Sequence, residues 1–110
     1  MAFIHKELAA GNWFVLPLAE QLGNIGSEIS RARQAEGKDG ERFQGARDRA
    51  LDLFDLTLQD SRWKGRRWEI ARAREVFCDA LYGGKLYGSS LGDLQKYFDQ
   101  FALAVRMRTQ

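Results

Sequence analysis

The 110-residue sequence contains one cysteine, one proline and one histidine, and these scarcities narrow the possible classes of protein. Cys78 alone forms neither an internal disulfide nor a thiolate zinc site, which agrees with a reducing compartment. No run approaches the roughly 18 consecutive apolar residues that cross a bilayer, and residues 1–12 lack the apolar core of a secretory signal. We therefore expect a cytoplasmic protein with no membrane-spanning segment.

Composition indicates one globular domain. Hydrophobic residues make up 45% of the chain and charged residues 29%, a balance typical of chains that fold. A chain of this length can bury one continuous core, whereas two domains would each have too little apolar surface to bury. We expect residues 1–110 to form a single domain.

Apolar residues recur at helical spacing in four segments, which predicts an all-α, up-and-down four-helix bundle preceded by a short N-terminal arm. The expected helices run roughly over residues 16–33, 41–59, 62–81 and 91–108. The first has the clearest pattern, in steps of three and four residues: Val15, Leu18, Leu22, Ile25, Ile29 and Ala32. Ser90 and Asp93 begin the last helix with the spacing of a capping box.

Small residues interrupt the first expected helix on a face beside its apolar stripe: Gly23, Gly26, Ser27 and Ser30. Each glycine costs up to ~1 kcal/mol relative to alanine in a helix interior, so a structural reason is required. Close approach of another helix supplies one. The sequence leaves open whether that helix belongs to the same chain or to a second subunit.

A basic and aromatic segment stands out because the whole chain carries a formal charge of only +2. Between Arg62 and Arg74, six basic residues accompany one acid, Glu69. The candidate contact residues are Arg62, Trp63, Lys64, Arg66, Arg67, Trp68, Arg72 and Arg74. Cations that neutralise phosphates, beside indoles that stack on bases, are typical of nucleic-acid binding. The same composition also occurs where tryptophans pack and arginines keep only their charged ends in water, so both interpretations remain open.

Residues suited to catalysis are few. His5 is the one histidine and lies in the arm, so a histidine-dependent site requires the arm to fold over the bundle. Asp48, Asp52 and Asp55 are spaced to share one stripe of the second helix, which we expect to be exposed. The Glu and Glu-x-x-His pattern of metal-binding bundles does not occur, so we predict neither a metal nor a cofactor.

Three phrases of the sequence resemble a family of small, uncharacterised all-α prokaryotic proteins: residues 18–32 (LAEQLGNIGSEISRA), 49–57 (RALDLFDLT) and 73–79 (AREVFCD). This resemblance implies no activity. In architecture the chain is loosely similar to the Avd accessory proteins of diversity-generating retroelements, which are oligomers that bind nucleic acid and a reverse transcriptase. It is also similar to HEPN ribonucleases, whose motif places an arginine shortly before a histidine. His5 has no arginine before it, so the resemblance implies a HEPN-like domain without the catalytic motif.

These observations predict a non-catalytic accessory or adaptor protein that self-associates or docks on a larger protein or ribonucleoprotein. The small-residue face of the first helix (Gly23, Gly26, Ser27 and Ser30) and the basic and aromatic segment would carry the contact, with RNA or DNA as a further candidate ligand. Two alternatives remain open. One is a small metal-dependent hydrolase or nuclease that uses His5 or the aspartate stripe, and the other is a purely structural oligomer.

Overall fold

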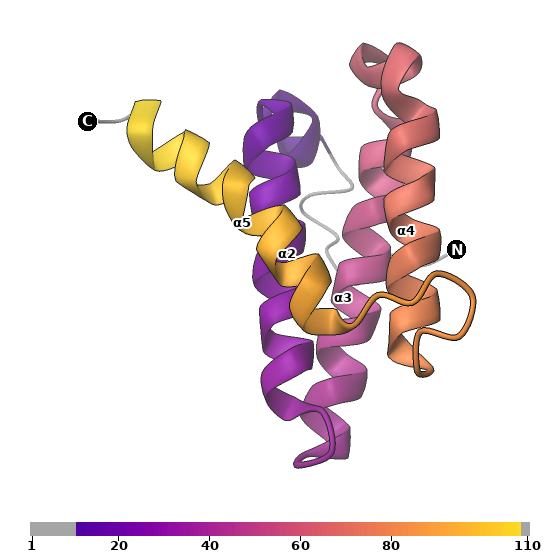
Figure 1. The fold of residues 1–110 in the computed structure, drawn as a ribbon. Helices are drawn as coiled ribbons and strands as arrows, with labels where there is room; N and C mark the ends of the chain where they lie inside the picture. The colour runs from indigo at the N-terminus through magenta and orange to yellow at the C-terminus, as the bar shows by residue number, and fades with distance from the viewer. Residues whose placement is uncertain (1–10, 109–110) are drawn as a thin grey trace.

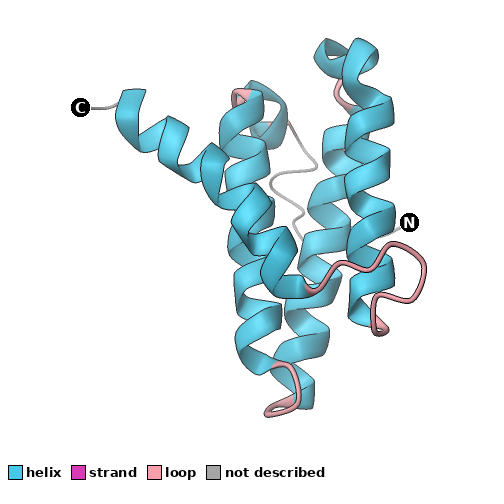
Figure 2. Cartoon of the chain, viewed as in Figure 1, coloured by secondary structure: helices cyan, strands magenta, loops and turns pink. Residues whose placement is uncertain are grey.

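The computed structural model describes residues 11–108, and all regular structure in this range is helical (Figures 1 and 2). In chain order the elements are two 3₁₀ helices and four α-helices: η1 (Asn12–Val15), α2 (Leu18–Ala35), α3 (Gly40–Gln59), η2 (Ser61–Arg66), α4 (Arg67–Leu81) and α5 (Leu91–Arg108). The α-helices pack against one another, which confirms the expected all-α four-helix bundle. The N-terminal arm with His5 lies outside the described residues.

Local capping explains where the helices begin. The Asp39 carboxylate accepts a hydrogen bond from the Arg42 amide (3.1 Å) at the start of α3. At α5, the Ser90 hydroxyl accepts from the Asp93 amide (3.1 Å), and the Asp93 carboxylate accepts from the Ser90 amide (3.0 Å). The capping box predicted from the sequence is therefore confirmed. Pro17 is the N-cap of α2, so this helix begins at Leu18 rather than at residue 16.

The apolar stripe of α2 forms one side of the core. Leu22, Ile25, Ile29 and Ala32 are buried, as their spacing predicts. Val15 is exposed because it belongs to η1, so its expected place on the stripe is wrong. At the centre, the fully buried Phe54 of α3 has its ring centroid 5.8 Å from that of Phe77 and 5.9 Å from that of Phe98. One aromatic side chain therefore joins α3 to both α4 and α5.

The last helix, α5, does not lie alongside the other three helices as a regular four-helix bundle requires. α2, α3 and α4 run up and down side by side, whereas α5 crosses diagonally over α2 and ends beyond it, far from α4 (Figure 1). α5 packs chiefly on α2 and makes few contacts with α4. The bundle is consequently open between α4 and α5.

The glycines of α2 allow this crossing. A Cβ atom on Gly26 would lie 2.8 Å from Cβ of Phe98, and a Cβ on Gly23 would lie 3.6 Å from Cα of Ala102. The helix that approaches closely is therefore α5 of the same chain. Ser27 lies on the rim of this contact and donates a hydrogen bond to the Gly23 carbonyl (3.2 Å). Ser30 accepts one from Gln34 (3.3 Å) and, with the other three small residues, lines a hollow beside α5.

The two glycines give a matched pair of variants. Gly26→Ala is expected to lower the free energy of unfolding by about 1–2 kcal/mol, because over-filling the contact with Phe98 outweighs the gain in helix propensity. Gly23→Ala places its methyl group at an ordinary van der Waals distance, so it is expected to be neutral or stabilising by up to ~1 kcal/mol. Urea denaturation of both variants checks the difference. Equal effects would contradict the crossing geometry.

Candidate functional site

The basic and aromatic segment is not one continuous helix. The expected helix over 62–81 is interrupted, because residues Ser61–Arg66 form the 3₁₀ helix η2 and the regular helix α4 begins at Arg67. Trp63 lies outside helical geometry at φ −104° and ψ 23°. Its indole NH donates to the side-chain oxygen of Gln21 (2.8 Å), a contact with α2 that the local sequence does not reveal.

Gln21 is the centre of a buried polar network. It is fully buried, and its amide NH₂ donates to the Trp13 carbonyl (2.9 Å) and to the Asp60 carboxylate (3.0 Å). With the bond from Trp63, both ends of this amide are satisfied. The network joins η1, α2 and the connection between α3 and η2, and we call it the Gln21–Asp60 network.

Arg62 belongs to this network, although its side chain is still 38% exposed. Its guanidinium binds the buried Asp60 carboxylate through two nitrogens (2.7 Å from Nη2 and 3.0 Å from Nε), and Nη2 also donates to the Leu16 carbonyl (2.6 Å). These hydrogen bonds from Arg62, with the one from Gln21, lower the pKa of Asp60 from 3.8 to about 2. Arg62 therefore fixes the start of η2, and most of its donors are already occupied.

The other cations of the segment are also partly engaged within the chain. Arg66 pairs with Glu69 (3.1 Å), and Arg74 pairs with Asp55 (2.9 Å). Arg67 donates to the Leu58 carbonyl (3.2 Å), and the Arg72 guanidinium lies over the Tyr87 ring, 4.5 Å from its centroid. Lys64 is exposed.

Carboxylates of the same chain thus neutralise part of the positive charge of the basic and aromatic segment, which leaves the segment less suited to polyanions than its composition indicates. Nucleic-acid binding by it stays a prediction.

Trp68 lies on a different surface, away from the Gln21–Asp60 network. Its side chain is 75% exposed and lies on the wall of a groove of about 460 Å³ between α4 and α5. The lining residues are Trp68, Glu69, Arg72, Ala73, Val76, Ser89, Asp93, Leu94 and Tyr97, and we call this the α4–α5 groove. A smaller hollow beside Ile70 and Phe101 shares three of these residues. Trp68 and Arg72 are the residues of the basic and aromatic segment that line this groove. Its α5 wall could not be found from the local sequence, because it depends on how α5 crosses.

The C-terminal half of α5, residues 99–108, is apolar but poorly covered. None of these residues is buried, although six of them are apolar: Phe101, Ala102, Leu103, Ala104, Val105 and Met107. Leu103 is 51% exposed and Met107 is 65% exposed. They are four residues apart and therefore share one face of the helix.

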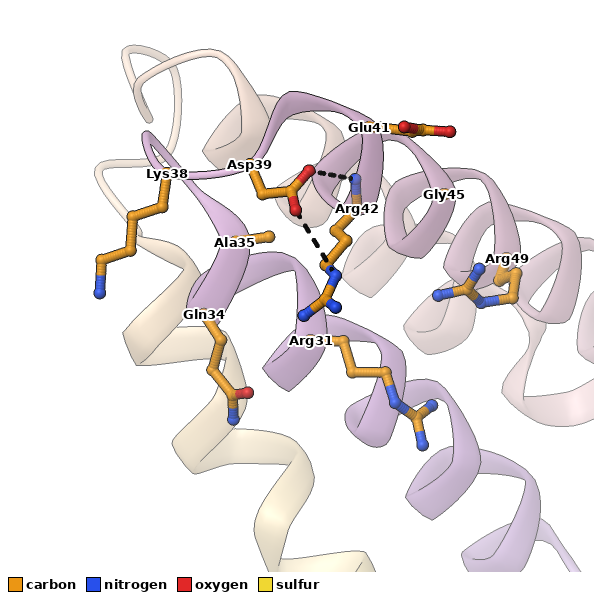
Figure 3. A pocket seen from close by; sticks show the side chains of 9 residues that line it. All are labelled: Arg31, Gln34, Ala35, Lys38, Asp39, Glu41, Arg42, Gly45 and Arg49. Carbon is orange, nitrogen blue, oxygen red and sulfur yellow. Dashed lines mark hydrogen bonds and ion pairs between the residues drawn. The ribbon is translucent and has the colours of Figure 1, made fainter.

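A second cavity lies where the turn after α2 meets the start of α3 (Figure 3). Its volume is about 1050 Å³, and it is lined by Arg31, Gln34, Ala35, Lys38, Asp39, Glu41, Arg42, Gly45 and Arg49. Because four of these residues are cationic, we call it the arginine cavity. Behind its wall, the buried Glu28 carboxylate forms ion pairs with Arg31 and with Arg49 (2.6 Å to Nε). The sequence does carry a signal for Glu28, since it lies on the apolar stripe between Ile25 and Ala32.

The aspartates of α3 differ from the sequence-based expectation. Asp52 is buried, so the expectation of an exposed stripe through Asp48, Asp52 and Asp55 is wrong. Within residues 11–108, no three histidine, cysteine, aspartate or glutamate side chains are grouped to hold a metal ion. Nor does any helix in this range have the length and apolarity to span a membrane.

The chain matches no family model, no curated protein and no solved structure. The similarity to Avd and HEPN bundles therefore stays a prediction from the sequence.

Proposed function

We propose that this protein is a non-catalytic helical accessory protein that acts as a self-associating module. In this proposal the C-terminal half of α5 of one copy docks in the α4–α5 groove of another. The observation that carries it is the poor burial of residues 99–108, combined with a largely apolar groove on the same chain. Paired surfaces of this kind are typical of interfaces between proteins.

A single chain cannot join these two surfaces. The first half of α5 packs on α2, and its residues Leu91, Leu94 and Phe98 are all buried. The second half continues the same helix away from α4 (Figure 1), so it cannot turn back into its own groove. A second copy supplies the same helix without that constraint, and mutual docking would form the self-complementary contact of a two-fold dimer.

The two surfaces fit in length and chemistry. The α4 residues that line the groove run from Trp68 to Val76, about 12 Å along the axis at 1.5 Å per residue. Residues 99–108 extend about 15 Å. Leu103 and Met107 have the i, i+4 spacing with which helices enter apolar grooves.

Light scattering coupled to size-exclusion chromatography tests the proposal. The wild-type protein is expected to form a dimer. Leu103→Glu with Met107→Glu, or Trp68→Glu in the groove, is expected to raise the dissociation constant by about tenfold or more, because each buries an unpaired charge. All three positions are exposed, so circular dichroism should show folded variants.

Leu86→Glu is the matched control. It introduces the same charge at a leucine that is also exposed but lies in neither surface, so it should leave the dimer intact. A wild-type protein that stays monomeric as its concentration rises would overturn the proposal. Dimers of equal affinity in all variants would overturn it too, since the interface would then lie elsewhere.

A further inference from the structure

The geometry points to a second binding site on this chain: the arginine cavity accepts a phosphate group. This inference is independent of the proposed self-association, because the cavity lies at the α2–α3 turn and shares no residue with the α4–α5 groove. The guanidinium groups of Arg42 and Arg49 border one gap, with Arg31 on the neighbouring helix (Figure 3).

A buried carboxylate organises two of these arginines. Glu28 is only 5% exposed and offers one oxygen to Arg31 and the other to Nε of Arg49. Two cations therefore share one anion, which leaves an excess positive charge at the cavity wall. Each guanidinium has five N–H donors, and these contacts occupy one nitrogen of each. The remaining donors can bind a tetrahedral anion in the forked geometry that arginine prefers.

The backbone of α3 makes room for Arg49. A glycine in a helix interior is unfavourable, and Gly45 lies in the second turn of α3. A Cβ atom there would lie 3.1 Å from Nη1 of Arg49. Glycine thus allows the guanidinium to lie against the helix while Glu28 holds its Nε. Both features hold the Arg49 guanidinium at the cavity wall before any ligand binds, which lowers the entropic cost of binding.

The site does not depend on the amino terminus of α3. Asp39 already occupies the Arg42 amide and pairs weakly with the Arg42 guanidinium (3.5 Å). The lining contains four cations and two acids, Asp39 and Glu41, and Glu28 behind the wall is a third acid, so the local charge is positive by one. The balance favours an anion, and three arginines favour phosphate because of their bidentate geometry. The phosphate could belong to a small molecule or to a nucleic-acid backbone, since the recognising chemistry is the same.

Isothermal titration with three probes tests the site and separates the sources: inorganic phosphate, pyrophosphate and a single-stranded oligouridylate. Pyrophosphate is expected to bind the wild-type protein. Arg31→Gln and Arg49→Gln are each expected to weaken binding by about tenfold, the effect of losing one charge-assisted hydrogen-bonding group. Arg47→Gln is the matched control on α3, because Arg47 pairs with Asp48 and does not line the cavity, and it should bind as wild type does.

Arg31→Gln or Arg49→Gln could unfold the protein, because each removes a partner of Glu28. In that case Arg42→Gln tests phosphate binding instead, since the Arg42 side chain is 84% exposed and its loss should not affect folding. Binding of oligouridylate alone, lost in the cavity variants, assigns the phosphate to a nucleic acid and supports the site. Binding of pyrophosphate or phosphate with the same losses assigns it to a small molecule. Failure of every probe to bind, or equal affinity in Arg42→Gln and wild type, overturns the inference.

Discussion

Phe54→Ala is expected to lower the free energy of unfolding by about 3–5 kcal/mol, which is the usual cost of emptying a fully buried aromatic site. Phe54 has no exposed surface, and its ring contacts Phe77 of α4 and Phe98 of α5. Because α4 and α5 contact each other little, few other side chains can compensate for the cavity. Since small domains are stable by about 5–15 kcal/mol in total, the variant should be close to unfolding at ambient temperature.

Urea denaturation followed by circular dichroism measures this effect. Phe54→Leu keeps most of the side-chain volume and is expected to cost less than about 1.5 kcal/mol. Leu86→Ala, at an exposed loop leucine, should change stability by less than about 0.5 kcal/mol. A Phe54→Ala variant as stable as Leu86→Ala would show that Phe54 does not join the three helices.

Asp60→Ala is expected to lower the free energy of unfolding by about 3 kcal/mol at neutral pH. The carboxylate caps the Arg62 amide (3.0 Å), a contact typically worth about 1 kcal/mol. Its loss also leaves the buried amide of Gln21 with an unsatisfied donor, which costs about 1–3 kcal/mol. Asp48→Ala removes only an exposed partner of Arg47 and should cost less than about 1 kcal/mol, so it is the matched control.

The same carboxylate predicts an acid dependence. Folding lowers the pKa of Asp60 from 3.8 to about 2, so its ionised form stabilises the fold above about pH 4. This contribution, about 2 kcal/mol, is lost as the pH falls from 4 through 2. The stability difference between wild type and Asp60→Ala should therefore shrink as the pH falls from 4 towards 2. A difference that stays constant over that range would contradict the ionic role of Asp60.

Regular periodicity made much of the fold predictable. The stripe from Leu22 to Ala32 needs only the 3.6-residue period to identify its buried face, and the Ser90 and Asp93 pair is a local cap. Both depend on residues close together in the sequence. They could therefore be inferred before any tertiary contact was known.

What could not be predicted depends on distant contacts. Arg62 and Trp63 have the composition of a free, basic helix start, yet Asp60 and Gln21 bind them and shape η2. Gln21 is a polar residue on α2 that is buried only because its partners come from other elements. The candidate surfaces follow the same rule, since the α4–α5 groove exists only because α5 crosses α2.

The division of charge also became clear only in three dimensions. The sequence concentrates cations between Arg62 and Arg74, where Asp60, Glu69 and Asp55 pair with three of them. The cations around the α2–α3 turn are less conspicuous in the sequence because Arg31 and Arg49 lie on different helices. Their shared partner Glu28 brings them to one wall. Spacing along one helix does not reveal such a cluster.

Cross-linking between copies tests the proposed self-association most directly. In a Cys78→Ser background, one copy carries Met107→Cys on α5 and a differently tagged copy carries Glu69→Cys at the groove rim. Oxidation of the mixture should give a disulfide that joins the two tags and is removed by reductant, because the proposed docking brings the C-terminal half of α5 of one copy, with Met107, into the groove of the other, which Glu69 lines. A yield no greater than with Leu86→Cys in place of Met107→Cys would contradict the account.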